Sequence, residues 1–317
     1  MTTLNQQTAQ ANERFTVKIL LLIVTAVVVV GSTPLAATSG ELPSGEYFVT
    51  QSWLQEKKFK RPYYINVPPG AGQRKLPVFV FLHGNGGNAK GAMDSFRRGH
   101  PLMAARYIMV FPEGYLKSWN IVSERSKADD RGFIETIVEK LSTYDNVQKD
   151  NVTIMGSSNG AALVNQLAIE CRLPNIRNYI TSVSPLNVFQ HDGRNFKAKG
   201  DDNNYRAVTT PLAGKRLMNI SGTDDRLVPY HGGLSRGIPA KGGKLGFVDA
   251  EESIFLWAKT MGYKGEKLSR PSRVAGNLEI FSYLDGAVVH FKVTGEGHGA
   301  MRAIDEETLL EFLNNKR

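Results

Sequence analysis

The residues at positions 156–160, Gly-Ser-Ser-Asn-Gly, hold the serine best placed for chemistry in this chain. A β-branched run precedes them at 151–155, and apolar residues at helical spacing follow at 161–170. A strand, a sharp turn and a helix expose a serine hydroxyl for nucleophilic attack, and small flanking residues let the backbones pass. The alternative is an ordinary turn between two core elements. Pattern and setting together predict that Ser158 is a nucleophile.

The same Gly-x-Ser-x-Gly pattern occurs a second time, at 233–237 around Ser235. The residues before it, 229–232, do not have a strand pattern. Pro239 and the glycines at 242 and 243 follow it, and these residues cannot open a helix. We therefore predict that Ser235 is a loop serine without a catalytic role.

An activated serine needs a histidine that takes its proton and a carboxylate that holds the histidine. Residues 221–230, which follow a strand pattern at 216–220, contain two adjacent acids, Asp224 and Asp225. They come after Ser158 and before the last histidines, which gives the order Ser, Asp, His. Spacing alone does not choose between the two acids.

Three histidines follow the two acids. His290 lies in the alternating pattern 288–293, which is typical of a half-buried strand, so we predict a structural role for it. His231 directly follows the acid loop and needs no role beyond that of a loop residue. His298 stands in the glycine-rich stretch 295–299, past the last strand, where an imidazole can reach the serine. We predict that His298 is the general base.

The charge that develops on a carbonyl oxygen during attack needs backbone N–H groups aimed at it. Asn159, the residue after the nucleophile, is expected to donate one of them. The other is expected from residues 83–87, His-Gly-Asn-Gly-Gly, which directly follow a strand pattern at 78–82. Asn85 or Gly86 would donate it, and we favour Asn85.

The same glycine-rich stretch also fits a different class of enzyme. Residues 84–89 match G-x-G-x-x-A, the dinucleotide-binding pattern. That pattern requires an acidic residue at a strand end about 20 positions later, whereas Glu113 comes later still, after Pro112. We therefore disfavour a nucleotide cofactor. Because the histidines are scattered without metal-ligand spacing, we predict no cofactor and no metal.

Strand patterns alternate with helical patterns from about residue 45 onward, which predicts a mostly parallel sheet with helices on both faces. A hairpin is expected to turn at Asp285-Gly286. The polar stretch 187–210 is expected to form a long loop. Further strands are expected at 63–67, 107–111, 179–183, 278–284 and 287–294, and helices at 130–141, 250–261 and 305–313.

The first 37 residues differ from the rest of the chain. A polar start is followed by a mostly apolar run at 19–30 and by small residues at 31–37. The run is shorter than the roughly 20 residues that span a bilayer. We predict a signal peptide over 1–37 and a single domain over 38–317. The alternative is an uncleaved membrane anchor, and both place the domain outside the cytosol.

The composition is that of a globular protein, since 41% of the residues are hydrophobic and 22% are charged. The net charge of +9 is not gathered in a basic cluster interleaved with aromatic residues, so we predict no nucleic-acid partner. Cys171 is the only cysteine, which rules out an intramolecular disulfide, and we expect it to be buried.

Short motifs occur together in this chain at 83–84, 111–114 with 119–120, 129–133, 156–161, 222–230 and 295–298. With these motifs the chain resembles the secreted esterase family that includes feruloyl esterases and polyhydroxybutyrate depolymerase-like proteins. The likeness runs from roughly residue 60 to the C-terminus. The resemblance implies the α/β-hydrolase fold, and it places the catalytic acid four residues before Pro229, which selects Asp225.

The resemblance also implies that Trp119 and Asn120 bind substrate, with a packed loop aromatic as the alternative. We therefore predict a secreted serine esterase with Ser158, His298 and Asp225 as its triad. Its partner would be a feruloyl, aryl or short hydroxyacyl ester, linked to a polysaccharide or a polyester. The open alternatives are a polyhydroxyalkanoate depolymerase, a non-catalytic binding protein with this fold, and a serine peptidase.

Overall fold

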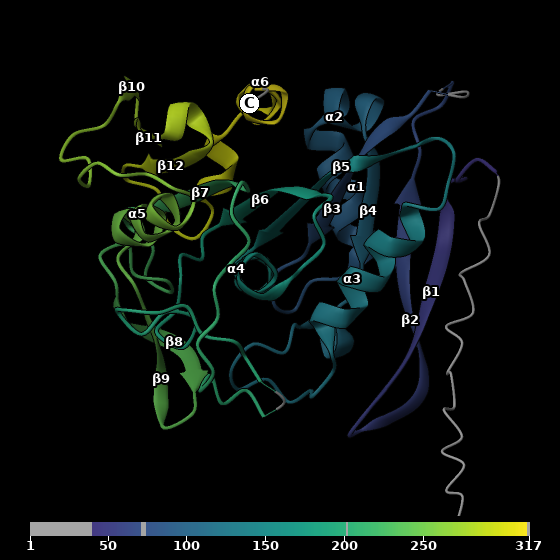
Figure 1. Cartoon of the computed structure of the whole chain (residues 1–317), viewed down its shortest axis with the longest axis horizontal. Helices are drawn as coiled ribbons and strands as arrows, with labels where there is room; N and C mark the ends of the chain where they lie inside the picture. Colours follow the sequence, from purple (N-terminus) through teal and green to yellow (C-terminus); the bar gives the residue numbers. More distant parts are fainter. Residues whose placement is uncertain (1–39, 71–73, 201, 316–317) are drawn as a thin grey trace, which may run out of the picture. The chain divides into compact units, whose positions relative to one another are not determined.

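Ten strands form one central sheet in the computed structural model, which describes residues 40–70, 74–200 and 202–315 (Figure 1). The predicted N-terminal segment 1–37 lies outside the described residues. From one edge to the other, the strands are β1 (Gly45–Trp53), β2 (Glu56–Asn66), β4 (Ile108–Pro112), β3 (Leu76–Leu82), β5 (Val147–Ser157), β6 (Ile176–Ser182), β7 (Arg216–Gly222), β12 (Val288–Val293), β11 (Leu278–Tyr283) and β10 (Arg273–Ala275).

The strands from β4 to β12 in this order are parallel to their neighbours, and antiparallel pairs complete both edges. Every residue of β4 and of β7 is buried. Strands that are buried on both faces are expected in a parallel sheet covered by helices. The predicted mostly parallel sheet is therefore confirmed.

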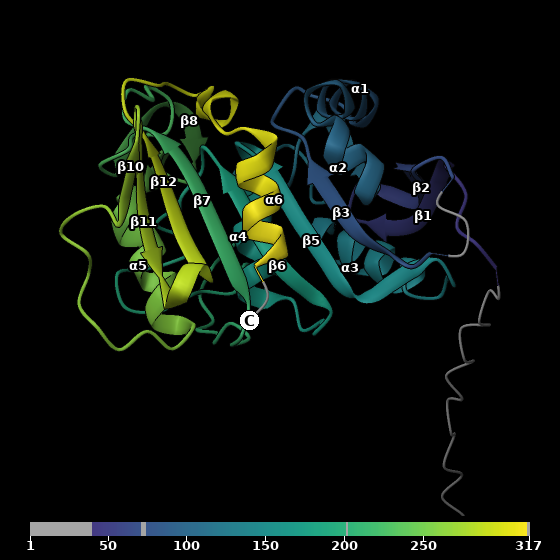
Figure 2. The same cartoon turned by 90° about the horizontal axis from the view of Figure 1, so that it is seen from above.

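Helices cover both faces of the sheet, and two hydrophobic clusters attach them. One cluster contains Phe133, Leu163 and Trp257, and the other contains Phe96 and Leu309. Figure 2 shows α6 (Glu306–Asn314) in front of the central strands and α4 (Asn159–Glu170) behind them. The first cluster holds α3 (Asp130–Leu141), α4 and α5 (Ala250–Thr260), and the second holds α1 (Ala89–Gly99), α2 (Pro101–Arg106) and α6.

One predicted turn differs in the structure. The hairpin of β11 and β12 does not turn on two residues, because Tyr283 pairs with Val288 and a 3-10 turn at Leu284–Gly286 connects the two strands.

Ser235 does not lie in a loop, contrary to the prediction. It lies in a second, two-stranded sheet made of β8 (Gly233–Ala240) and β9 (Gly243–Phe247). The glycines and Pro239 hid this hairpin, since these residues are depleted in strands.

The polar stretch 187–210 is a loop, as predicted. Its described residues form only isolated bridges, among them Lys197 with Val208. Sequence patterns missed β1, α1 and α2. In α1, apolar residues do stand at helical spacing, at Ala89, Ala92, Met93 and Phe96, so this helix could have been predicted from the sequence. No helix of the described part of the chain is long and apolar enough to cross a membrane.

Candidate active site

Ser158 lies on a tight turn between β5 and α4. Its backbone has a φ of 53° and a ψ of −119°, a conformation that non-glycine residues rarely adopt. The turn is possible only because its neighbours lack side chains. A Cβ on Gly160 would overlap the carbonyl oxygen of Leu82, and one on Gly156 would overlap the backbone of Gly160. The sequence Gly-Ser-Ser-Asn-Gly therefore builds the strained strand–turn–helix unit that exposes a serine hydroxyl.

His298 connects Ser158 with Asp225. Its Nε2 lies 2.9 Å from the Ser158 Oγ, and its Nδ1 lies 2.7 Å from Asp225 Oδ2. The other Asp225 oxygen accepts the amides of Leu227 and Val228 at 2.8 and 2.9 Å. The carboxylate is therefore held on both sides. With a proton on Nδ1, the Nε2 lone pair faces the serine hydroxyl, as general-base activation requires.

The loops after β7 and β12 bring the acid and the histidine together. The Asp224 amide donates to the Glu296 carbonyl at 2.9 Å, and the Gly295 amide donates to Thr223 Oγ1 at 2.8 Å. A Cβ on Gly222 would overlap the Glu296 carbonyl, so the two loops can lie this close only with glycine there. The Asp224 side chain is exposed and accepts a hydrogen bond from the Thr223 hydroxyl. Of the two adjacent acids, the structure brings Asp225 to the histidine.

The two remaining downstream histidines lie elsewhere. His290 is completely buried in β12, with Nδ1 at 2.9 Å from Asn219 Oδ1 and Nε2 at 2.8 Å from the Tyr230 hydroxyl. Burial lowers its pKa to about 3. The His231 side chain is 81% exposed, beside Asp249. Both placements agree with the roles that the sequence predicts for them.

Two unpaired backbone amides lie beside Ser158. The Gly86 amide donates to the Lys117 carbonyl at 2.8 Å, and Gly87 donates to Gly84 at 3.0 Å. Among the residues that the structure describes, the amides of Asn85 and Asn159 have no such partner. Asn159 is the first residue of α4, where an amide has no partner within the helix. Both residues line the same cavity as Ser158, so both amides are available to a negative oxygen there.

The cavity beside Ser158 has a volume of about 860 Å³. This is within the range of roughly 300–1,000 Å³ that small-molecule sites occupy. Its walls come from two segments far apart in the sequence, the loop at 115–126 and the stretch 227–247 that contains β8 and β9. The apolar residues that line it include Tyr115, Leu116, Leu227, Ile238, Leu245 and Phe247.

No family model matches the sequence. The chain is similar to feruloyl esterase B of Piromyces equi, with 22% identity over 235 residues that cover 72% of this chain and 40% of that protein. The chain thus spans less than half the length of this curated relative. The likeness confirms the resemblance to feruloyl esterases that the motifs indicate.

Two solved structures are similar in fold. Acetyl xylan esterase from Aspergillus awamori superposes with a TM-score of 0.54 at 15% identity, over 85% of this chain and 98% of that one. A thermostable esterase superposes with a TM-score of 0.53 at 13% identity, over 86% and 63% of the two chains. This chain has the α/β-hydrolase fold. Its Ser158, Asp225 and His298 follow β5, β7 and β12, at the carboxyl ends of the parallel strands where α/β folds place their sites.

The structure corrects the prediction that Trp119 and Asn120 contact the substrate. Both are buried, at 0% and 2% exposure, and neither lines the cavity beside Ser158. The Trp119 indole donates to the His83 carbonyl at 2.8 Å, and the Asn120 side chain donates to the Ala128 carbonyl at 3.2 Å. The structure therefore gives the packed-aromatic alternative the better support.

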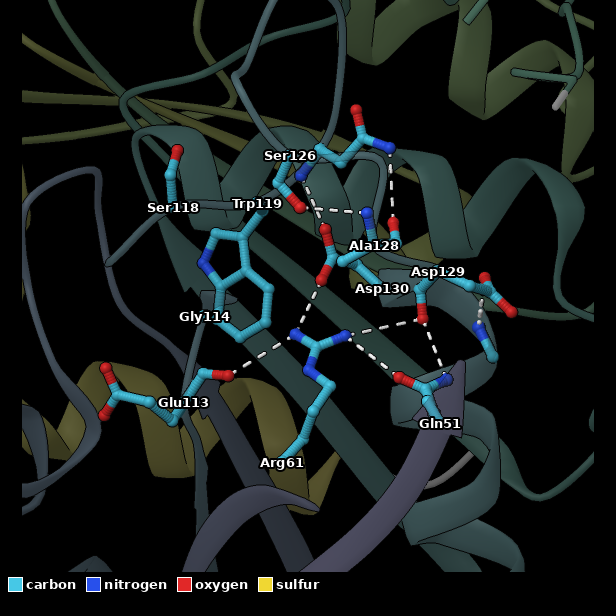
Figure 3. Close-up of polar contacts among 12 residues, drawn as sticks. Gln51, Arg61, Glu113, Gly114, Ser118, Trp119, Ser126, Ala128, Asp129 and Asp130 are labelled. Atoms are coloured by element: carbon cyan, nitrogen blue, oxygen red, sulfur yellow. Dashed lines mark hydrogen bonds and ion pairs between the residues drawn. The ribbon is translucent and has the colours of Figure 1, made fainter. Parts of the chain in front are cut away.

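A buried ion pair holds the segment around Trp119, as Figure 3 shows. Arg61 reaches Asp130 at 2.6 Å, and both side chains are almost completely buried. The other oxygen of Asp130 accepts the Asn120 amide at 2.5 Å. Arg61 also lies over the ring of Phe133, 3.9 Å from its centre. This network fixes Asn120, in the middle of the loop at 115–126 that forms one wall of the cavity.

None of the described residues of the loop 187–210 lines the cavity. The loop instead contacts Asn120 and Ile121 of the cavity wall. Tyr205 donates to the Ile121 carbonyl at 2.7 Å, and Asn203 donates to the Asn120 side chain at 2.7 Å.

Sequence reasoning missed Glu124 and the side chain of Asn159. Asn159 Oδ1 accepts the Trp119 amide at 2.7 Å, and its Nδ2 donates to Glu124 at 3.2 Å. Glu124 lines the cavity and also accepts the amide of Ile121 at 2.7 Å. Burial raises the pKa of this carboxyl group. No sequence pattern could reveal these contacts, because they join residues 35 and 40 positions apart.

The structure also bears on the disfavoured nucleotide site. The N-terminus of α1 is where the phosphates of a dinucleotide would bind. Here the Glu113 carboxylate accepts the Ala89 amide at 2.7 Å, and Asn88 accepts the Gly91 amide at 2.8 Å. The chain's own acidic side chain therefore occupies that position.

Proposed function

We propose that this protein is a serine esterase that hydrolyses carboxylic esters through an acyl-enzyme. The observation that carries the proposal is the placement of His298, within hydrogen-bond distance of both Ser158 and Asp225. In the proposed reaction the Ser158 Oγ attacks the ester carbonyl, and His298 Nε2 takes the hydroxyl proton. The amides of Asn85 and Asn159 stabilise the negative oxygen of the tetrahedral intermediate.

The intermediate then collapses to the acyl-serine. His298 gives its proton to the alcohol, which leaves, and Asp225 stabilises the charged imidazolium in between. Water enters, loses a proton to His298 and attacks the acyl-serine by the same route. This releases the acid and restores Ser158.

The substrate class that we propose is an aryl or short-chain ester, including feruloyl and hydroxyacyl esters linked to polysaccharides. The similar proteins named feruloyl esterase and acetyl xylan esterase support this choice. The apolar cavity walls support an apolar group beside Ser158. A panel of methyl ferulate, acetylated xylan, a soluble hydroxybutyrate oligomer and a small peptide amide tests it. Faster cleavage of the oligomer would instead assign a polyhydroxyalkanoate depolymerase, and cleavage of the peptide alone would assign a peptidase.

Active-site labelling tests the mechanism independently of the substrate. A fluorophosphonate should form a covalent adduct that peptide mapping places on Ser158. Ser158→Ala should abolish both the labelling and ester hydrolysis, whereas Ser235→Ala should retain the label. A label on Ser235, or no label on a folded protein, would contradict the proposal and favour a non-catalytic binding protein.

We further propose that the protein is exported and then acts outside the cytosol, secreted or anchored. The apolar run at 19–30 and the small residues after it support this. The N-terminal sequence of the protein recovered from a culture tests it. Medium containing chains that begin near residue 38 would support secretion, and full-length chains in the membrane fraction would support an anchor.

A further inference from the structure

The second Gly-x-Ser-x-Gly serine, Ser235, has a full set of hydrogen bonds. Its hydroxyl is buried, donates to the Leu227 carbonyl at 2.6 Å, and accepts the amides of Gly237 and Ile238 at 3.2 and 2.9 Å. One donor and two acceptor positions are all that a serine hydroxyl offers. Ser235 therefore holds three backbone groups in fixed positions.

Two of these groups, the amides of Gly237 and Ile238, belong to an irregularity in the β8–β9 hairpin. Leu234 pairs with Gly246 and Pro239 pairs with Lys244, so residues 235–238 stand opposite Leu245 alone. Such a bulge bends a strand and re-aims its side chains. Two of the three Ser235 hydrogen bonds lie inside this bulge, and the third attaches it to Leu227.

The bulge faces the cavity beside Ser158. Ile238 and Pro239 line the cavity from β8, and Leu245 and Phe247 line it from β9. Across the cavity, the Ser123 hydroxyl of the loop at 115–126 donates to the Pro239 carbonyl at 2.8 Å. The hairpin is therefore attached at both ends, to the acid loop through Ser235 and to the facing wall through Ser123.

We infer that the β8–β9 hairpin is the wall that selects the apolar group of the substrate, and that Ser235 is the positioning residue that shapes this wall. The inference rests on the proposed esterase function and names its selective element. A fixed apolar wall in a large cavity favours an ester that carries a flat aryl ring over one without it, because only the former covers the wall.

The test compares kcat/KM for methyl ferulate with kcat/KM for methyl acetate, an ester that is small on both sides. Ile238→Ala should lower the ferulate-to-acetate ratio on the order of tenfold, since it removes apolar contact from the wall. Ser235→Ala should lower the same ratio because the bulge loses its three hydrogen bonds. Leu234→Ala is the matched control. Leu234 lies on the same hairpin, is 71% exposed and does not line the cavity, so its ratio should equal that of the wild type.

The ratio separates a wall effect from an effect on the triad. Leu227 donates to Asp225 and accepts from Ser235, so a displaced acid loop would slow both esters equally. An unchanged ratio in Ile238→Ala would overturn the inference that the hairpin selects the apolar group. An unchanged ratio in Ser235→Ala, beside a lowered one in Ile238→Ala, would overturn the role of Ser235. Ser235→Thr keeps the hydroxyl and replaces Ser235→Ala should the latter not fold. Its ratio should stay near the wild-type value, and a ratio as low as that of Ile238→Ala would overturn the positioning role.

Binding without turnover distinguishes failure of this inference from failure of the esterase proposal. The affinity of the Ser158→Ala protein for methyl ferulate, measured by calorimetry, should weaken on the order of tenfold when Ile238→Ala is added. Wild-type protein that hydrolyses no ester would refute the esterase function, while the calorimetry would still test whether the hairpin binds the apolar group. Equal affinity of the two proteins for methyl ferulate would show that it does not.

Discussion

The Asp225 carboxylate of the candidate site is held on both sides. One carboxylate oxygen accepts hydrogen bonds from the two amides of the following turn. The other oxygen contacts the His298 ring. Asp224, one position earlier, has an exposed side chain and no contact with the histidine. The pair therefore offers a comparison between two neighbouring acids.

Asp225→Asn should lower kcat by about 10⁴, because an amide cannot hold the imidazole in the tautomer that accepts the serine proton. Asp224→Asn is the matched control and should leave kcat within a few-fold of the wild type. Steady-state kinetics on one ester of the panel measure both. Equal losses in the two variants, or a larger loss in Asp224→Asn, would show that the acid is misassigned.

At this scale the sequence predicted the residues that lie in ordered motifs. Ser158, the acid loop and His298 follow carboxyl ends of parallel strands, and chain order alone brings them to one edge of the sheet. The sequence could not place Trp119, because a tryptophan in a loop has the same pattern whether it faces a cavity or the core. Its burial follows from contacts with His83 and Asn159, which are far away in the sequence.

The loop from β4 to α3 depends on the buried pair of Arg61 and Asp130. Arg61 comes from β2, and Asp130 opens α3. One Asp130 oxygen binds Arg61 and the other binds the Asn120 amide. The same carboxylate thus anchors the strand β2, the helix α3 and the wall of the cavity.

Asp130→Ala should lower the free energy of unfolding by about 3–5 kcal/mol, because it leaves the Arg61 charge buried without its partner. Activity should also fall, since the Asn120 amide loses its acceptor. Asp129→Ala is the control. Asp129 caps α3 by accepting the Gly132 amide, and losing such a cap costs about 1 kcal/mol. Urea unfolding measures both values, and similar losses in the two variants would contradict the role given to the buried pair.

Strands and helices with regular patterns could be predicted, whereas the β8–β9 hairpin could not. Val78 and Ile108 belong to continuous apolar runs that mark buried parallel strands. In β8, only Ser235 is buried, and glycines and Pro239 interrupt the alternation. This strand is held by a bulge, a serine hydroxyl and a contact with a distant loop, none of which leaves a periodic pattern.

Over the described part of the molecule, three histidines are buried: His83, His191 and His290. A Glu113 carboxylate oxygen lies 4.0 Å from His83 Nε2. Burial lowers the pKa of each, that of His290 to about 3. His290 lies within the sheet and His83 at the end of β3, so both rings are part of the packed interior. The folded protein therefore resists protonation at sites that the unfolded chain protonates freely.

The stability of the whole molecule should fall in mild acid. An unfolded histidine has a pKa of about 6.5, so below that pH the unfolded chain binds protons that folded His290 binds only near pH 3. Between these values, His290 lowers the free energy of unfolding by up to about 1.4 kcal/mol per pH unit. The lowered pKa values of His83 and His191 act in the same direction. Glu124 opposes this trend, because burial raises its pKa and the folded state then binds its proton more readily.

A comparison with His290→Gln isolates the contribution of one ring. Gln can still hydrogen-bond Asn219 and Tyr230 but does not titrate. The unfolding free energy of the variant protein should therefore fall less steeply than that of the wild type between pH 6.5 and pH 4.5. Urea unfolding at several pH values gives the slope of the unfolding free energy against pH for each protein. The two slopes should differ by an amount that approaches the binding of one proton by His290 on unfolding. Parallel curves for the two proteins would mean that His290 is protonated as readily in the folded state as in the unfolded chain, against its complete burial.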